Sequence, residues 1–296
     1  MFARMARLAR IVAACAALLH SPLAAQPGDW DAVARTLGRA GAEQPGGVMR
    51  FSFPRSDLRV TVDGVAIRPA LALGSWVAFR HTAGGAMAMG DLVLAEDEVA
   101  PVISRLQQGG VDASAVHNHL LREQPRVTYV HIEAHGDAER IAQTVRSALA
   151  LTRTPMQPPA PPAAAAPLAL DTAALARALG HAGRVNGGVW QVSVARAEAI
   201  RMHGDTVPPA MGVATAINLQ PTGGGKSAAT GDFVMTAGEV PGVLRALRAN
   251  GIEVTALHSH MVGEEPRLYF AHFWANADAL QVARGLRAAL AVMSVR

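Results

Sequence analysis

The chain has little cysteine, few aromatic residues and modest charge. Its 296 residues include one cysteine, Cys15. A single thiol cannot form a disulfide within the chain, and thiol catalysis would depend on that residue alone. Aromatic residues make up only 4% of the sequence, so we expect cores filled mainly by Ala, Val and Leu. Half of the residues are hydrophobic and 17% are charged. This composition indicates a globular protein and excludes a disordered one, and the length suits two domains.

The sequence also lacks a basic segment of the kind that follows a phosphate backbone. Lys and Arg number 27 against 23 Asp and Glu, and three of these arginines lie near the N-terminus. No stretch clusters Lys or Arg with aromatic residues, as a nucleic-acid surface requires. We therefore expect no nucleic-acid partner.

The N-terminal 25 residues have the pattern of a secretory signal peptide. Arg4, Arg7 and Arg10 precede an apolar run from Ile11 to Leu19, and small residues follow at a cleavage point before Gln26. The run is too short for a spanning helix, which needs about 20 residues. Without this leader, the Lys and Arg residues number 24 against 23 acidic residues. The pattern predicts a periplasmic or secreted protein.

A lipid-anchored form is the alternative. Val12-Ala13-Ala14-Cys15 resembles a bacterial lipobox, and cleavage there would leave a lipid on Cys15 and place the protein on a membrane. The apolar run before the cysteine is short for that route. We therefore favour the soluble exported form, in which membrane association requires lipidation of Cys15.

An internal repeat organises the rest of the chain. A shift of about 141 residues superimposes the second half on the first. Gly90-Asp91 then falls on Gly231-Asp232, and Glu98-Val99 falls on Glu239-Val240. Residues 115–138 fall on 256–279 with identities that include His117, His119, Glu123, Pro125, Arg126, His131, Ala134, Asp137 and Ala138. We predict a first repeat domain over 27–151 and a second over 168–296, joined by a Pro/Ala-rich linker over 152–167.

The order of predicted elements indicates an α+β fold. A helix over 29–37, matched at 171–179, precedes strand-like segments around 48–53, 59–62, 75–80 and 91–94. A helix over 96–108, two strands over 113–120 and 126–134, and a helix over 137–149 follow. This order predicts two tandem homologous domains, each a mainly antiparallel sheet with helices packed on one face, and a ferredoxin-like C-terminal part.

Each repeat carries the same three histidines, His117, His119 and His131 in the first and His258, His260 and His272 in the second. Residues i and i+2 of a strand share one face. A hairpin centred near Gln124 would pair His117 with His131 and His119 with Tyr129. All three imidazoles of each repeat would then lie together on one face of the sheet.

Converging neutral imidazoles suit a transition metal, with zinc and copper as the main candidates. Three protein ligands leave a position for water or substrate. Glu123 and Glu264 occupy equivalent positions after the paired histidines. They are candidates for a fourth ligand, an orienting group or a catalytic general base.

Two interpretations without a metal remain open. The histidines can form a polar pocket for a small ligand, or they can be hydrogen-bonding residues of the core, since duplication copies structural residues as faithfully as functional ones. Similarly, Arg55-x-Asp57 and Arg196-x-Glu198 suit structural ion pairs better than an anion site. The Gly223–Ser227 segment suits a hairpin turn better than a phosphate loop.

These motifs resemble the LppY/LpqO lipoprotein family. The resemblance rests on the segment 115–119 with Glu123-x-Pro125 and His131, on Gly90-Asp91 with Glu98-Val99, and on the segment 68–79. It covers both halves and implies an exported, often membrane-anchored bacterial protein, without implying a reaction. The second repeat departs from the first at Ser259, Phe270 and Trp274, which makes the first site the more polar.

Three functions are compatible with the sequence. The first is an exported protein that binds zinc or copper through a three-histidine site in each repeat. The second is a metal-dependent hydrolase with Glu123 as general base. The third is a metal-free module that binds a small polar or cell-envelope ligand.

Overall fold

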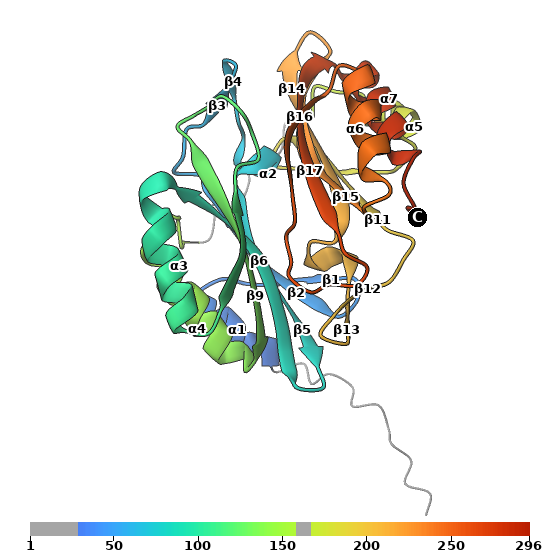
Figure 1. Ribbon diagram of the computed structural model, residues 1–296. Coiled ribbons are helices and arrows are strands. Elements are labelled where there is room, and N and C mark those ends of the chain that lie inside the picture. The colour runs from blue at the N-terminus through green and yellow to red at the C-terminus, as the bar shows by residue number, and fades with distance from the viewer. Residues whose placement is uncertain (1–28, 158–166) are drawn as a thin grey trace, which may run out of the picture.

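The computed structural model describes residues 29–157 and 167–296 (Figure 1). The predicted signal peptide, the lipobox and the central part of the predicted linker lie outside the described residues. Within the described part of the chain, no helix is long and apolar enough to cross a membrane.

The first half forms a six-stranded antiparallel sheet in the order β1-β2-β5-β6-β9-β7. Its strands are β1 (Ala42–Gln44), β2 (Val48–Pro54), β5 (Gly74–Thr82), β6 (Gly85–Ala95), β7 (Asp112–His117) and β9 (Val127–Gly136). A small sheet adds β3 (Thr61–Val62), β4 (Val65–Ala66) and β8 (Glu123–Gln124). The helices are α1 (Asp29–Leu37), α2 (Pro69–Ala72), α3 (Val99–Gln108) and α4 (Ala138–Leu149), and a 3-10 turn η1 (Glu96–Glu98) precedes α3.

The second half repeats this sheet in the order β10-β11-β14-β15-β17-β16. Its strands are β10 (Arg184–Asn186), β11 (Val189–Ala195), β14 (Ala214–Gly223), β15 (Lys226–Met235), β16 (Glu253–His258) and β17 (Tyr269–Asp278), with a hairpin of β12 (Ile200–Met202) and β13 (Asp205–Val207). The helices are α5 (Thr172–Leu179), α6 (Val240–Ala249) and α7 (Ala279–Leu290), with a 3-10 turn η2 (Pro209–Met211). The predicted α+β class, with antiparallel sheets and helices on one face of each, is confirmed.

Local signals in the sequence fix the ends of the helices. The side chain of Asp137 accepts a hydrogen bond from Arg140 N at 2.7 Å and caps α4, and Asp278 caps α7 in the same way through Gln281 N. The predicted helix over 96–108 begins with the 3-10 turn η1 and ends at Gly109, as expected. Where a polar side chain or a glycine marks the end of a helix, the sequence alone is therefore sufficient to predict that end.

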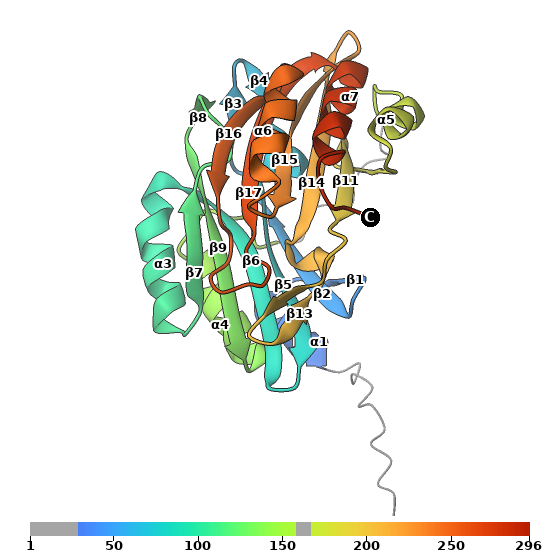
Figure 2. The ribbon, with the colours of Figure 1, turned by 45° about the vertical axis from the view of Figure 1, so that its right-hand side comes forward.

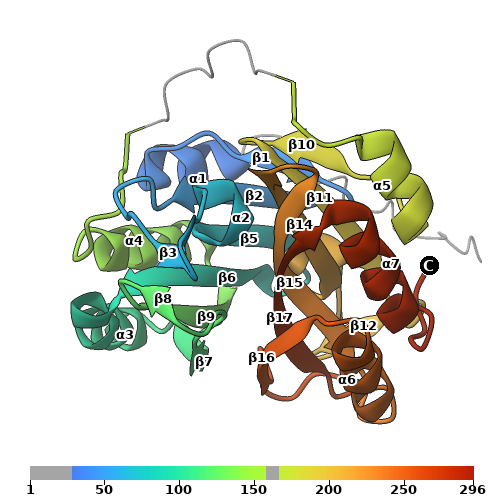
Figure 3. The same ribbon diagram turned by 90° about the horizontal axis from the view of Figure 1, so that it is seen from above.

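The two sheets pack face to face, with the helices on the outside. Figures 1 and 3 show α1, α3 and α4 covering the outer face of the first sheet and α5, α6 and α7 covering the second. Alternate residues of β6 serve the two faces: Leu92 and Leu94 lie in the core under the helices, whereas Met87 and Met89 face the second half. Every residue of β6 from Ala86 to Leu94 is buried, because both faces of this strand are covered.

Apolar residues of both halves join across the interface in two clusters. One includes Met87 and Met89 of the first half with Met202, Met211 and Phe270 of the second. The other brings residues of β3, α2 and β9 together with Val189, Ala228 and Trp274. The two repeats therefore share buried surface and do not sit apart on their linker.

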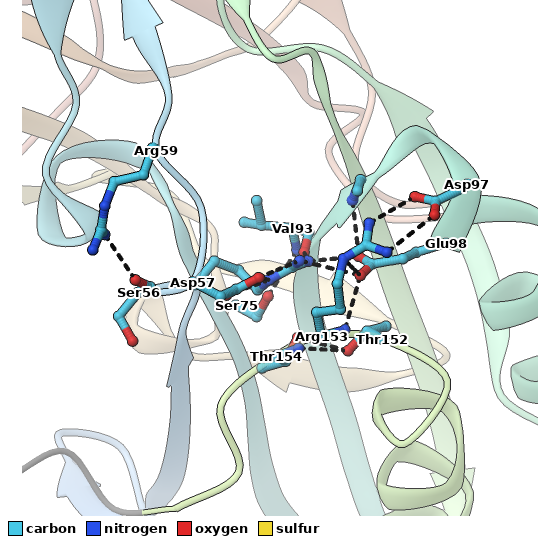
Figure 4. A network of polar contacts seen from close by, with 12 residues as sticks. Ser56, Asp57, Arg59, Ser75, Val93, Asp97, Glu98, Thr152, Arg153 and Thr154 are labelled. Atoms are coloured by element: carbon cyan, nitrogen blue, oxygen red, sulfur yellow. Dashed lines mark hydrogen bonds and ion pairs between the residues drawn. The ribbon is translucent and has the colours of Figure 1, made fainter.

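A buried arginine ties together three segments of each half. Arg55 contacts Asp57 at 2.9 Å and Glu98 at 2.7 Å, and it donates to the carbonyl of Val93. Figure 4 shows the surrounding network, in which Glu98 also accepts from the backbone of Arg153.

The second half repeats this arrangement with Arg196, Glu198 and Glu239. In both halves the guanidinium group binds carboxylates and a carbonyl of the protein itself. The structure therefore supports a structural role for the Arg55 and Arg196 motifs.

Candidate metal centre

The three histidines of the first repeat do come together on one face of the sheet. His117 is the last residue of β7, His131 lies in β9, and His119 follows in the loop. The His117 ring centroid lies 5.0 Å from that of His119 and 5.0 Å from that of His131. The predicted convergence of these imidazoles is confirmed.

The predicted strand register is wrong by two residues. His117 pairs with Tyr129, and Ala115 pairs with His131, after a bulge between Ala113 and Ala115. The connection between β7 and β9 is not a tight hairpin, because Gln124 within it forms β8 and pairs with Thr61 of β3. A shift of two residues keeps every side chain on its face of the sheet, so the convergence survives the error.

The two triads do not form separate sites. Strands β7 and β9 lie opposite β16 and β17 across the interface (Figures 2 and 3). The histidine rings stack in three pairs, one member from each half, with centroids 3.5 to 3.7 Å apart: His117 with His258, His119 with His272, and His131 with His260. The six imidazoles make one cluster at the junction of the repeats.

Reciprocal hydrogen bonds hold the two halves in this register. Ser114 Oγ donates to the carbonyl of His260 at 2.6 Å, and Thr255 Oγ1 donates to the carbonyl of His119 at 2.5 Å. Ser114 and Thr255 are equivalent positions of the repeat, so the interface has an approximate twofold symmetry. That symmetry superimposes one triad on the other.

Burial keeps five imidazoles of the cluster neutral, those of His117, His119, His131, His258 and His260. Burial, reinforced by the neighbouring histidines, lowers the pKa of His117 to about 3 and that of His258 to about 4. The same causes lower the pKa of His119, His131 and His260 well below the ordinary value. Neutral imidazole is the form that binds metal ions.

Backbone carbonyls orient several of these rings. Nδ1 of His117 lies 3.3 Å from the carbonyl of Asn118, and Nδ1 of His258 lies 3.2 Å from that of Ser259. Nδ1 of His272 lies 3.1 Å from the carbonyl of Gly231. A carbonyl accepts only, so the Nδ1 atom carries the proton in each ring. In a neutral ring the lone pair is then on Nε2.

The Nε2 atoms lack protein partners that suit a lone pair. Among the described residues, Nε2 of His117, His119, His131 and His260 is buried without a hydrogen bond. Nε2 of His258 and Nε2 of His272 lie 2.8 Å apart, although both rings have Nδ1 on a carbonyl. Two lone pairs at that distance repel unless a cation or proton lies between them. Two nitrogens bound to one tetrahedral ion at about 2.0–2.1 Å each are about 3.3 Å apart, so these two rings would separate slightly to share a metal.

Two aspartates that sequence reasoning did not assign also belong to the cluster. Asp91 of β6 lies 3.8 Å from Nε2 of His131 and 4.0 Å from Nε2 of His119. Asp232 of β15 lies 2.7 Å from Nδ1 of His272. The sequence signal that could have found these two aspartates is the match of Gly90-Asp91 with Gly231-Asp232 between the repeats.

The two aspartates differ in their charge state. Burial raises the pKa of Asp91, and the charge of Asp232 adds to this shift. For Asp232, burial acts in the same upward direction, but the charge and hydrogen bond of His272 outweigh it and lower the pKa. Asp232 is therefore the carboxylate that orients a histidine.

Glu123 and Glu264 are held by their own loops. Oε1 of Glu123 accepts from Val127 N at 3.2 Å, and Oε1 of Glu264 accepts from Leu268 N at 2.8 Å. Both side chains are buried, and burial raises the pKa of Glu123 to about 7. No hydrogen bond or ion pair between described residues joins either carboxylate to the six imidazoles. Their role as general bases stays a prediction.

The cluster offers two groups of donor atoms for metal ions. His117, His119 and His131 form one, and His117, His258, His260 and His272 form the other; within each group the ligand atoms lie within 4.8 Å of one another. The second group draws donors from both repeats, and His117 belongs to both groups. The donor set is imidazole throughout, which suits zinc, copper, iron or nickel and not calcium or magnesium.

The sequence profile of a family described as Domain of Unknown Function (DUF1259) matches residues 31–151 and again 173–292. The chain belongs to this family. The two matches confirm the tandem repeat, and each DUF1259 unit contributes one histidine triad. No curated protein matches the sequence.

Two solved structures align with low similarity. One is a trimeric bacterial microcompartment shell protein PduB, with 14% identity and a TM-score of 0.24 over 86% of this chain and 90% of that one. The other is EtuB from Clostridium kluyveri, with 10% identity and a TM-score of 0.20 over 85% of this chain and 91% of that one. Similarity at this level carries no conclusion about function.

Proposed function

We propose that this protein is an exported bacterial metal-binding protein whose two repeats build one shared centre for zinc or copper. The observation that carries the proposal is the convergence of the buried histidine donor atoms to within 4.8 Å of one another, in rings of which four have an Nε2 with no hydrogen-bond partner among the described residues. A cation bound by the larger donor group would give the unpartnered Nε2 atoms of His117 and His260 a partner, and those of His119 and His131 belong to the smaller group. The N-terminal signal pattern supports export, and lipidation at Cys15 would add a membrane anchor.

The outer surroundings of the cluster are those of a metal site. Carbonyls fix the protonated nitrogen of several rings, and Asp232 adds a carboxylate on the far side of His272. Such outer partners orient ligands and raise their basicity. A carrier or scavenger needs only this binding, whereas the hydrolase alternative also needs a base at the metal, and neither Glu123 nor Glu264 contacts the histidines in the described residues.

Metal analysis of the purified mature protein tests the proposal. We expect one to two equivalents of zinc or copper per chain after reconstitution and removal of loosely bound ions, measured by mass spectrometry of the elements. His258→Ala removes a member of the larger donor group and lowers the bound metal. His135→Ala is the matched control, because His135 lies on β9 outside both donor groups.

Two results would overturn the proposal. One is metal content in the wild-type protein no higher than in His258→Ala. The other is a thermal stability that neither chelator nor added zinc or copper changes, since a ligand that binds the native state must stabilise it. Stabilisation by a small polar molecule under the same conditions would favour the metal-free binding module.

A further inference from the structure

A small cavity opens between the two halves beside the histidine cluster. It has a volume of about 10 Å³, room for roughly one water molecule. His131 and His260 line it, and their stacked rings are each 6% exposed with an unpartnered Nε2. Trp76 and Gly212, both half-buried, lie at the same cavity. The cavity is therefore bordered by one histidine of each donor group.

Two methionines also line this cavity, together with Gly90, Ser114 and Ile132. Met89 comes from β6 of the first half, two residues before Asp91 on the same face of the strand. Met211 is the last residue of η2 in the second half. Both are buried in the apolar cluster of the interface, 6% and 0% exposed. The small cavity is thus lined by one methionine and one histidine from each repeat.

Duplication does not account for this pair of methionines. The strand pairings align Met89 with Thr230, which precedes the Gly-Asp of β15. The loop after the buried arginine is one residue shorter in the second half, so beyond it Met211 aligns with Leu71. Neither methionine has a methionine at its repeat position. Thr230 and Leu71 occupy the equivalent positions on the other side of the cluster, and neither side chain contains sulfur.

The chemistry of this lining separates copper from zinc. Thioether sulfur is a soft ligand that favours Cu(I), whereas Zn(II) prefers imidazole, thiolate and carboxylate. The only cysteine lies in the predicted leader, so methionine is the sole sulfur ligand of the mature chain. Six imidazoles alone bind either metal.

From this juxtaposition we propose that the centre takes copper as Cu(I), and that the ion reaches His131 and His260 through the Met89–Met211 cavity. This inference rests on the proposed metal-binding function. The bound ion is Cu(I) throughout, so no electron transfer is involved. The alternative is that the two methionines only fill space, as methionine often does in cores.

The test compares two double variants that each exchange methionine for leucine. Met89→Leu with Met211→Leu removes both sulfurs of the cavity at nearly constant volume. Met87→Leu with Met202→Leu is the control, because these residues belong to the same apolar cluster but do not line the cavity. The full mature chain is titrated with Cu(I) in competition with the chromophoric chelator bathocuproine disulfonate, and separately with Zn(II).

We expect the cavity variant to bind Cu(I) at least about tenfold more weakly, a loss within the range seen when partners of a metal site are removed. Its Zn(II) affinity and its melting temperature without metal should match those of the control. X-ray absorption should show sulfur in the copper shell of the wild type and of the control but not of the cavity variant.

The outcomes separate this inference from the function on which it rests. Equal Cu(I) affinity in both double variants, or copper without a sulfur ligand, overturns the copper inference and leaves zinc or copper binding by the histidines intact. Failure of the wild type to bind either ion overturns both. A cavity variant that loses Zn(II) and Cu(I) together shows a general disturbance of the interface and also overturns the inference.

Discussion

The two halves of this protein keep their metal-ligand candidates identical but differ in what surrounds them. Tyr129 of the first half stacks on His119 with centroids 3.3 Å apart, and Phe270 of the second stacks on His260 at 3.5 Å. Asp232 contacts His272 at 2.7 Å, whereas Asp91 comes no closer than 3.8 Å to His131. The first half is thus not simply the more polar of two equal sites. Each half supplies a different part of the outer surroundings of one centre.

The largest expected difference between the halves concerns their buried arginines. Arg55→Ala leaves the buried Glu98 with only the exposed Arg153 at 3.7 Å, and breaking a buried ion pair in this way costs about 3–5 kcal/mol. Arg196→Ala should cost less, because the side chains of its partners are more exposed: 13% for Glu239 and 38% for Glu198, against 3% for Glu98 and 21% for Asp57.

Urea unfolding of both variants checks this order. Arg59→Ala is the control, because Arg59 is exposed and donates to the carbonyl of Ser56 alone among the residues that the structure describes. It should change the free energy of unfolding by less than about 0.5 kcal/mol. A greater loss in Arg196→Ala than in Arg55→Ala would contradict the comparison.

A smaller effect, shared by the two halves, is expected from pH. The folded pKa values of His117 and His258 are lowered to about 3 and about 4, so the unfolded chain binds protons first as the pH falls below about 6.5. The stabilisation from keeping these rings neutral is complete above that pH and is lost as the pH falls toward 4. Each such histidine can contribute up to about 1.4 kcal/mol per pH unit.

Raised carboxyl pKa values, such as that of Glu123, act in the opposite direction. The measurement therefore compares metal-free wild type with His117→Gln and, separately, with His258→Gln, by urea unfolding at pH 7 and pH 5. We expect the stability advantage of the wild type over each variant to shrink at pH 5. An advantage that grows on acidification would show that these imidazoles are not held neutral.

The smallest effect is expected from a substitution that gives the first half the phenylalanine present at the equivalent position of the second half. Tyr129→Phe removes the hydroxyl that donates to the carbonyl of Ala72 at 2.8 Å, and keeps the ring that stacks on His119. The loss should be about 1 kcal/mol. Tyr269→Phe, at the only other tyrosine, is the matched control. Thermal unfolding that ranks the two variants equally would mean that the Ala72 bond contributes nothing.

Local features of the fold were predictable because their causes are local. The N-cap Asp137 and the glycines after α3 fix helix ends, and the segment Val62–Val65 forms the expected hairpin, with positive φ at Asp63 and Gly64. The register of β7 against β9 was not predictable, since the bulge before Ala115 and the pairing of Gln124 with β3 depend on distant strands. The shared face of His117 and His131 survived because side-chain alternation has a period of two residues.

What the sequence by itself determined is the duplication, the class of the fold and the placement of three imidazoles on one side of each sheet. Only the tertiary structure decided that those two sides face one another, which turns two triads into a single cluster and adds Asp91, Asp232, Met89 and Met211 to its surroundings. The physical reason is that strand periodicity states which face a side chain occupies but not what covers that face. Burial of the apolar clusters on both sides of the histidines makes the other repeat the cover.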